Sequence, residues 1–262
     1  MLEFSEILIP IIQRAGKIML SAHSVEEEGA VSEKYGDPAN LVTTYDIAIQ
    51  DFLISEITTV FPDAYFIAEE KENDSKNLTF EHCFVIDPID GTSNFIHQYS
   101  HSCISLAIIS KNEVVFAAIY DPYLDEMFSA ERAKGAFLNG RPMKVSERDV
   151  EHSILAYGTS PYRKNELGEK TFALAHKIFM QCGDVRRCGS AALDLAYLAA
   201  GRNDMFFELI LSPWDIAAGV LLIKEAGGII TDLEGRPIDL SRPCPVIAAT
   251  PKTYDFLLEN LK

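Results

Sequence analysis

The sequence of 262 residues has no long hydrophobic run, few cysteines and a shortage of basic residues. No apolar stretch approaches the ~18 residues that span a bilayer, so we expect no transmembrane helix and no membrane partner. The five cysteines are scattered and form no Cys-x-x-Cys pair, which favours reduced, mostly buried thiols in a cytoplasmic protein. Only 23 Lys and Arg face 39 Asp and Glu, a net charge of −16. Because nucleic-acid binding needs a basic surface, we expect no nucleic-acid partner.

Several familiar catalytic motifs are also missing. The chain has no G-x-S-x-G nucleophile turn and no G-x-x-x-x-G-K-[ST] phosphate loop. His97 and His101 have the spacing of a zinc-protease pair, but Gln98 stands where such a helix carries its glutamate. We therefore interpret both histidines as ordinary surface residues.

What the chain does contain is a short segment dense in turn-forming residues. Apolar residues 83–86 predict a short buried strand. Pro88 is expected to end that strand, because its ring fixes φ and removes an N–H donor. Gly91 permits a backbone turn that other residues resist, and Thr92 or Ser93 is expected to cap the helix that follows.

Acidic residues gather in and around this segment. Asp87 and Asp90 follow the predicted strand three residues apart, and two carboxylates this close would repel unless a cation lay between them. Carboxylate oxygens are ligands for hard cations, and the N–H groups of a helix N-terminus suit a phosphate. Further acidic residues occupy the ends of other predicted elements, at Asp46, Glu69-Glu70 and Asp215. Any one of these could simply be a helix cap.

Helical periodicity and β-branched apolar runs alternate along the remaining chain. They predict helices near residues 4–22, 46–60, 170–180, 190–200, 214–226 and 253–261. They predict strands near residues 64–68, 104–110, 113–120, 126–130, 135–138, 153–158, 184–188, 205–209, 228–232 and 246–249, with a loop at 34–40. An N-terminal half (residues 1–150) and a C-terminal half (residues 151–262) are expected to build an α/β layered sandwich.

The motifs together resemble the inositol monophosphatase family over nearly the whole chain, which implies a single catalytic unit over residues 1–262. The segments that carry the resemblance are Asp87-Pro88-Ile89-Asp90-Gly91-Thr92-Ser93-Asn94-Phe95, Trp214-Asp215-Ile216-Ala217-Ala218-Gly219, Glu225-Ala226-Gly227-Gly228, Leu41-Val42-Thr43 with Asp46, Glu69-Glu70, Gly135-Ala136-Phe137-Leu138-Asn139-Gly140, and Gly189-Ser190-Ala191-Ala192-Leu193. The resemblance implies an αβαβα sandwich, a homodimer, and hydrolysis of a small phosphomonoester with two or three Mg2+ ions per subunit. It also implies inhibition by Li+.

The resemblance further implies a role for each matching residue. One Mg2+ would be held by Glu69, Asp87 and the carbonyl of Ile89, and a second by Asp87, Asp90 and Asp215. Glu70 would help to place a further ion, and Asp46 with Thr92 would orient the attacking water. The backbone N–H groups of Gly91 and Thr92 would bind phosphate, and the alcohol portion of the substrate would meet Glu208, Ala191, Gly189 and Ser190.

The substrate stays open at this point. Inositol monophosphate is the leading expectation, while fructose 1,6-bisphosphate, 3′-phosphoadenosine phosphates, NADP and histidinol phosphate are alternatives, because one metal core can serve different substrate rims. A protein that keeps the fold for binding or regulation without catalysis is the alternative from another class.

Overall fold

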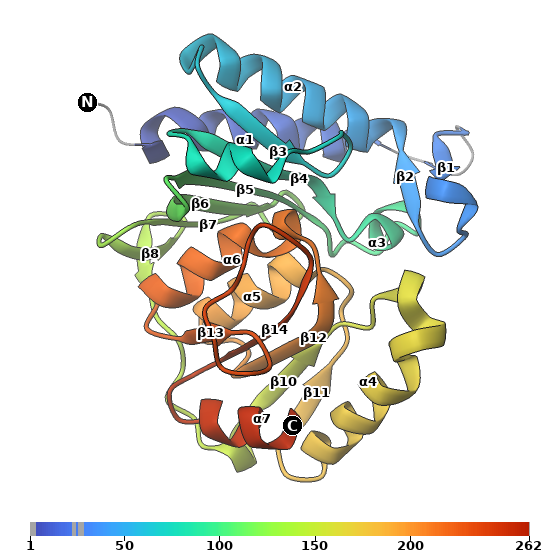
Figure 1. Cartoon of the computed structure of the whole chain (residues 1–262), viewed down its shortest axis with the longest axis vertical. Helices are drawn as coiled ribbons and strands as arrows, with labels where there is room; N and C mark the ends of the chain where they lie inside the picture. The colour runs from blue at the N-terminus through green and yellow to red at the C-terminus, as the bar shows by residue number, and fades with distance from the viewer. Residues whose placement is uncertain (1–3, 23–24, 26–28, 262) are drawn as a thin grey trace.

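The computed structural model describes residues 4–22, 25 and 29–261, which stack as alternating layers of helix and sheet (Figure 1). Helices α1 (Phe4–Leu20) and α2 (Thr44–Val60) cover one face of a seven-stranded sheet. Helices α5 (Ala191–Ala199) and α6 (Pro213–Glu225) lie between that sheet and a five-stranded one. Helices α4 (Lys164–Phe179) and α7 (Tyr254–Leu261) cover the outer face of the second sheet. The predicted layered α/β sandwich, in the order αβαβα, is confirmed.

The first sheet is largely antiparallel, with strand order β3-β4-β5-β6-β7-β8-β9 and one parallel pair, β3 with β4. Its strands are β3 (Tyr65–Ala68), β4 (Cys83–Asp90), β5 (Cys103–Ser110), β6 (Glu113–Asp121), β7 (Glu126–Glu131), β8 (Gly135–Leu138) and β9 (Arg141–Met143). Successive side chains of a strand point to opposite faces. Phe84 and Ile86 therefore join the core under α1 and α2, while Cys83 and Val85 join the core with α5 and α6. Burial on both faces explains the unbroken apolar runs in the sequence.

The second sheet is mixed, with strand order β11-β10-β12-β14-β13. Its strands are β10 (Ile154–Tyr157), β11 (Asp184–Arg186), β12 (Met205–Leu211), β13 (Ile229–Thr231) and β14 (Cys244–Ala249). Near the N-terminus, β1 (Val31–Glu33) and β2 (Leu41–Thr43) form a small antiparallel hairpin. Short 3₁₀ turns occupy Lys34–Gly36, Ser75–Thr79, Val150–His152 and Pro161–Arg163.

The end of β4 differs from the sequence prediction in two ways. Pro88 does not end the strand, which continues to Asp90 with a shift of register between Asp87 and Asp90. A β-bulge tolerates proline because the extra residue makes no ladder hydrogen bond. The predicted cap is also wrong: Gly91, with φ of +90°, holds the N-cap position of α3 (Thr92–Ile96), and no side chain caps that helix. A left-handed φ explains why glycine stands there.

Among the described residues, no helix is both long enough and apolar enough to span a bilayer.

Candidate metal and phosphate site

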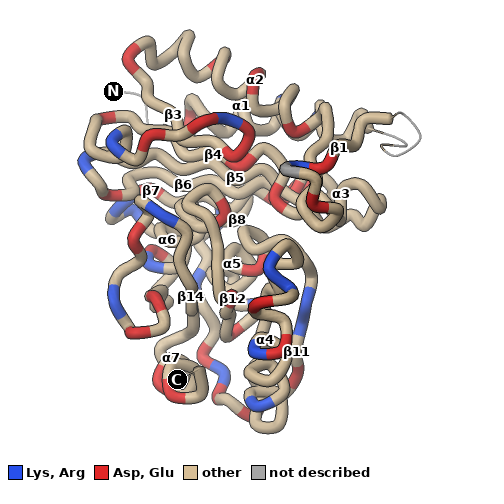
Figure 2. Tube along the Cα trace, turned by 45° about the vertical axis from the view of Figure 1, so that its right-hand side comes forward, with Lys and Arg blue, Asp and Glu red and all other residues tan. Residues whose placement is uncertain are grey.

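A pocket of about 360 Å3 opens where the end of β4 meets the N-termini of α5 and α6. It draws together residues that are far apart in the sequence. The predicted site residues that line it are Glu69, Asp87, Ile89, Asp90, Gly91, Thr92, Gly189, Ser190, Ala191, Glu208 and Asp215. Asp46 and Glu70 lie behind this lining and contact it through other side chains. Figure 2 shows acidic segments gathered beside α3 and β1, next to a basic segment.

Three aspartates form the centre of the site. One carboxylate oxygen from each of Asp87, Asp90 and Asp215 lies within 4.8 Å of the others. Asp87 accepts a hydrogen bond from the Ile89 N–H (3.1 Å), and Asp215 accepts one from the Ser212 N–H (2.7 Å) as part of the α6 capping box. Asp215 therefore caps α6 and is at the same time a member of the acidic cluster.

Asp90 is fixed by the start of α5. Its Oδ2 accepts hydrogen bonds from the Ser190 hydroxyl and from the Ala192 N–H (2.8 Å). Ser190 also caps α5 by accepting from the Leu193 N–H (3.3 Å). Residues of the two halves of the chain thus meet at one carboxylate.

The carboxylates of this cluster lie close enough to repel one another. Burial, followed by the charge of Glu69, raises the pKa values of Asp87 and Asp215 well above the ordinary range. Burial also raises the pKa of Asp90 to about 6, although the Ser190 and Ala192 hydrogen bonds oppose the shift. An all-oxygen donor set with this much uncompensated charge suits a hard divalent cation such as Mg2+.

Lys34 is the cation that the structure does place among these acids. Its Nζ donates to Glu69 Oε1 (2.7 Å) and Glu70 Oε1 (2.5 Å) from the loop after β1. Burial lowers the pKa of Lys34, but the two carboxylates outweigh that effect and raise it overall. The sequence predicted only a loop here, because a single lysine in an aperiodic segment carries no signal of its partners.

Asp46 lies beneath Thr92 at the start of α2. Its Oδ2 accepts from the Thr43 N–H (2.8 Å) and hydroxyl (2.5 Å), and its Oδ1 lies 3.5 Å from the Thr92 hydroxyl oxygen. The Thr92 hydroxyl is also 3.2 Å from the Ile89 carbonyl. Complete burial raises the pKa of Asp46 to about 7, despite the Thr43 hydrogen bonds.

Glu208 closes the opposite side of the pocket. Its Oε1 accepts from the Ser160 N–H (2.9 Å) and hydroxyl (2.7 Å), and burial raises its pKa to about 7. Gly158 makes room for this carboxylate, since a Cβ there would lie 1.8 Å from Glu208 Oε2. Ser160 has a φ of +40°, a strained conformation of the kind found at ligand sites. The sequence analysis missed Gly158 and Ser160, although a Gly-Thr-Ser run directly after a strand was a usable signal.

One histidine prediction is wrong. His97 is exposed as expected, but His101 is half-buried and packs edge-on against Tyr197, with ring centroids 5.8 Å apart. The sequence could not show this, because the side chains that cover His101 come from the C-terminal half. All five cysteines are free thiols; Cys83, Cys103 and Cys244 are buried and the other two half-buried.

The raised pKa values make the stability of the metal-free protein depend on pH. Asp46, Asp90 and Glu208 titrate near 6–7 in the fold, against ordinary values of 3.8, 3.8 and 4.5. The folded state therefore keeps protons that the unfolded chain releases, and its stability is lost as pH rises from about 4 through about 7. In EDTA we expect Tm to be several degrees lower at about pH 8 than at about pH 5, since 1 kcal/mol corresponds to about 2–4 °C here. Thermal unfolding followed by circular dichroism measures this, and a Tm that increased over the same range would contradict it.

Known proteins resemble this chain over almost all of its length. The sequence model of the Inositol monophosphatase family matches residues 1–262. The "Nus factor SuhB" of Escherichia coli (strain K12) is 37% identical over 257 residues, covering 98% of this chain and 94% of that protein. The "Inositol-1-monophosphatase" of Rhizobium meliloti (strain 1021) is 37% identical over 230 residues, covering 87% and 85%. The crystal structure of the extragenic suppressor protein suhB from Bartonella henselae superimposes with a TM-score of 0.88 at 32% identity, covering 98% and 97%. The chain belongs to the inositol monophosphatase family.

Proposed function

We propose that this protein is a Mg2+-dependent phosphatase that hydrolyses a small phosphomonoester, with inositol monophosphate as the leading substrate. One observation carries the proposal: Asp87, Asp90 and Asp215 converge within 4.8 Å in a pocket that the Gly91 turn also lines. Membership of the family supports the reaction class.

In this proposal the acidic cluster holds two or three Mg2+ ions. Glu69, Asp87 and the Ile89 carbonyl hold one ion, Asp87, Asp90 and Asp215 hold a second, and Glu70 helps to place a further one. When bound, the ions supply a water of lowered pKa and stabilise charge on the phosphate and the leaving oxygen.

The other residues position what reacts. Thr92 and Asp46 orient the attacking water, since the Thr92 hydroxyl lies between the Asp46 carboxylate and the pocket. The N–H groups of Gly91 and Thr92 bind phosphate oxygens, because both residues line the pocket at the start of α3. No nucleophilic side chain is required, because positioning and charge stabilisation dominate phosphoryl transfer.

The alcohol portion of the substrate faces Glu208 and the segment Gly189-Ser190-Ala191. Glu208 lines the pocket on the side away from β1, with its carboxylate held by Ser160. A carboxylate that accepts hydrogen bonds suits the hydroxyl groups of a polyol. Inositol monophosphate fits this description, and the test must compare it with fructose 1,6-bisphosphate, 3′-phosphoadenosine phosphates, NADP and histidinol phosphate, because these also offer polar groups to a carboxylate.

The decisive experiment measures phosphate release from this substrate panel with Mg2+, with EDTA, and with Mg2+ restored. We expect hydrolysis that needs Mg2+, that Li+ inhibits, and that has its highest kcat/KM on inositol monophosphate. Comparable kcat/KM on another panel member would replace inositol as the substrate. No phosphate release from any of them would favour the non-catalytic binding role, a point of interest because the E. coli relative is named a Nus factor.

We also propose that the enzyme acts as a homodimer on a small-molecule substrate, without a nucleic-acid or membrane partner. Sedimentation velocity gives the oligomeric state. Retention of the protein by RNA or lipid vesicles at physiological salt would contradict the proposed partners.

The Gly158→Ala substitution tests the place of Glu208 in substrate binding. The added methyl group would overlap the Glu208 carboxylate, so that side chain must move. We expect KM for inositol monophosphate to increase about tenfold, because a factor of that size corresponds to the loss of one good hydrogen bond to a charged group. We expect kcat to change little. Gly168→Ala is the matched control, because Gly168 lies within α4 and a Cβ there comes no closer than 4.0 Å to a neighbour. Equal KM for both variants would exclude Glu208 from substrate contact.

A further inference from the structure

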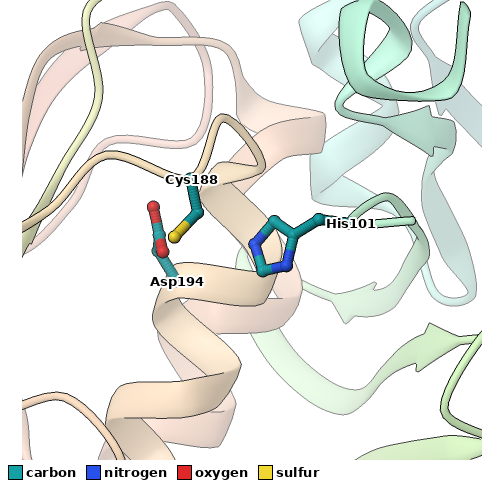
Figure 3. A group of neighbouring side chains, drawn as sticks. All are labelled: His101, Cys188 and Asp194. Atoms are coloured by element: carbon teal, nitrogen blue, oxygen red, sulfur yellow. The ribbon is translucent and has the colours of Figure 1, made fainter. Parts of the chain in front are cut away.

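A second group of metal-ligating side chains lies beside the acidic cluster, and the proposed phosphatase reaction does not use it. His101 precedes β5, Cys188 lies in the loop between β11 and α5, and Asp194 lies within α5. A ring nitrogen, the thiol sulfur and a carboxylate oxygen of these residues lie within 4.8 Å of one another. Figure 3 shows the His101 ring directed towards Cys188 and Asp194.

Two of these side chains have buried polar atoms that lack a partner. Among the described residues, His101 Nε2 and Asp194 Oδ1 are buried and make no hydrogen bond. Asp194 is only 2% exposed. A buried polar atom without a hydrogen-bond partner is unfavourable, so two in one cluster indicate that something polar is bound between them.

The charge of this environment favours a cation. The carboxylates of Asp90 and Glu208 both act on Asp194, and Arg187 offsets them only in part. A buried carboxylate without a counter-charge is unfavourable. A bound metal ion would supply that charge and satisfy the orphaned atoms at the same time.

We propose that His101, Cys188 and Asp194 form a Zn2+ site distinct from the acidic cluster. Imidazole nitrogen, thiolate sulfur and carboxylate oxygen are the ligands that zinc takes, whereas Mg2+ requires oxygen. Around tetrahedral zinc, ligand atoms lie about 3.3–3.8 Å apart. The side chains therefore have to close in by roughly 1 Å, which the half-buried His101 and Cys188 can do by rotation. Zinc replaces the thiol proton of Cys188, which leaves to solvent, and a water completes the coordination.

One side chain, Asn94, already fixes the backbone of two of the proposed ligands. The Asn94 side-chain amide donates to the carbonyls of His101 (2.8 Å) and Cys188 (2.8 Å). Asn94 lies in α3, directly after the Gly91 turn. Zinc would tie the N-terminal half to the C-terminal half beside the phosphate pocket, so its role is to stabilise that junction.

Metal titration of the intact protein in excess Mg2+ tests the site, because Mg2+ then occupies the acidic cluster. With Co2+ as a spectroscopic substitute for Zn2+, we expect one equivalent to give a thiolate charge-transfer band and tetrahedral d–d bands. Cys188→Ser should remove the charge-transfer band. Cys188→Ser and His101→Ala should each weaken Zn2+ binding at least about tenfold. Zinc should raise the Tm of the wild type but not of these variants.

Cys182→Ser is the matched control, because Cys182 is also a half-buried free thiol and bonds to the Asp184 carbonyl outside the cluster. Its Co2+ spectrum and Zn2+ affinity should equal those of the wild type. The proposal is wrong if Cys188→Ser keeps the charge-transfer band, if Zn2+ affinity survives both substitutions, or if excess Mg2+ abolishes Zn2+ binding to the wild type.

Discussion

Asp215→Asn is expected to reduce kcat/KM by about 10³-fold or more, because it removes a charged ligand from the proposed two-metal site. Folding should survive, since the asparagine oxygen can still accept the Ser212 N–H that closes the α6 capping box. The metal-free variant should even have a Tm at or above that of the wild type, because one charge is removed from three mutually repelling aspartates.

Steady-state kinetics with Mg2+ and thermal unfolding in EDTA measure the two effects separately. Asp255→Asn is the matched control: Asp255 also lies in the first turn of a helix, but it is exposed on α7, which packs on the outer face of the second sheet. Full Mg2+-dependent activity in Asp215→Asn would refute the metal assignment. Loss of activity together with a lower Tm would instead indicate that the aspartate acts mainly as a cap.

Thr92→Val is expected to reduce kcat by about 10²-fold or more, with KM little changed, because the hydroxyl that we propose orients the attacking water is lost. Valine keeps the shape of threonine, so the Gly91 turn and the start of α3 should persist. The contact in question joins the Thr92 hydroxyl to Asp46 Oδ1 at 3.5 Å, a long hydrogen bond.

Thr92→Ser keeps the hydroxyl and should retain most of the activity. Single-turnover measurements on both variants separate the chemical step from product release. Equal losses in Thr92→Val and Thr92→Ser would mean that the methyl group matters and the hydroxyl does not. That result would exclude Thr92 from the orientation of water.

Local signals predicted much of this fold. The apolar, β-branched runs of β5 and β6, the helix that became α5 and the layered architecture could all be identified from neighbouring residues. The predictions that failed concern positions whose conformation depends on tertiary contacts. Pro88 lies inside a β-bulge because β5 still pairs on both sides of it, and that partner is invisible in residues 83–91.

The residues of the candidate site could likewise be predicted only where local sequence motifs identify them. The aspartates could be identified because they belong to dense motifs with a fixed spacing. Lys34 could not, since it acts through Glu69, which lies 35 residues away. Ser160 was missed although the Gly-Thr-Ser run that contains it directly follows a strand, because its partner Glu208 lies 48 residues away. His101 was misjudged for the same reason, because its neighbours Cys188 and Asp194 come from the other half of the chain.

The ammonium group of Lys34 has a consequence for how the proposed metal site would bind its first ion. It bridges Glu69 and Glu70, so a divalent ion that binds these carboxylates as proposed would first have to displace the monovalent cation that the chain itself provides. Binding of the ion would then be an exchange reaction. The measured binding free energy would be the intrinsic binding free energy of the ion, offset by the free energy needed to separate the Lys34 ammonium group from the two carboxylates. A substitution that removes the Lys34 ammonium group should let the first ion bind more tightly, although the substitution adds no contact to that ion.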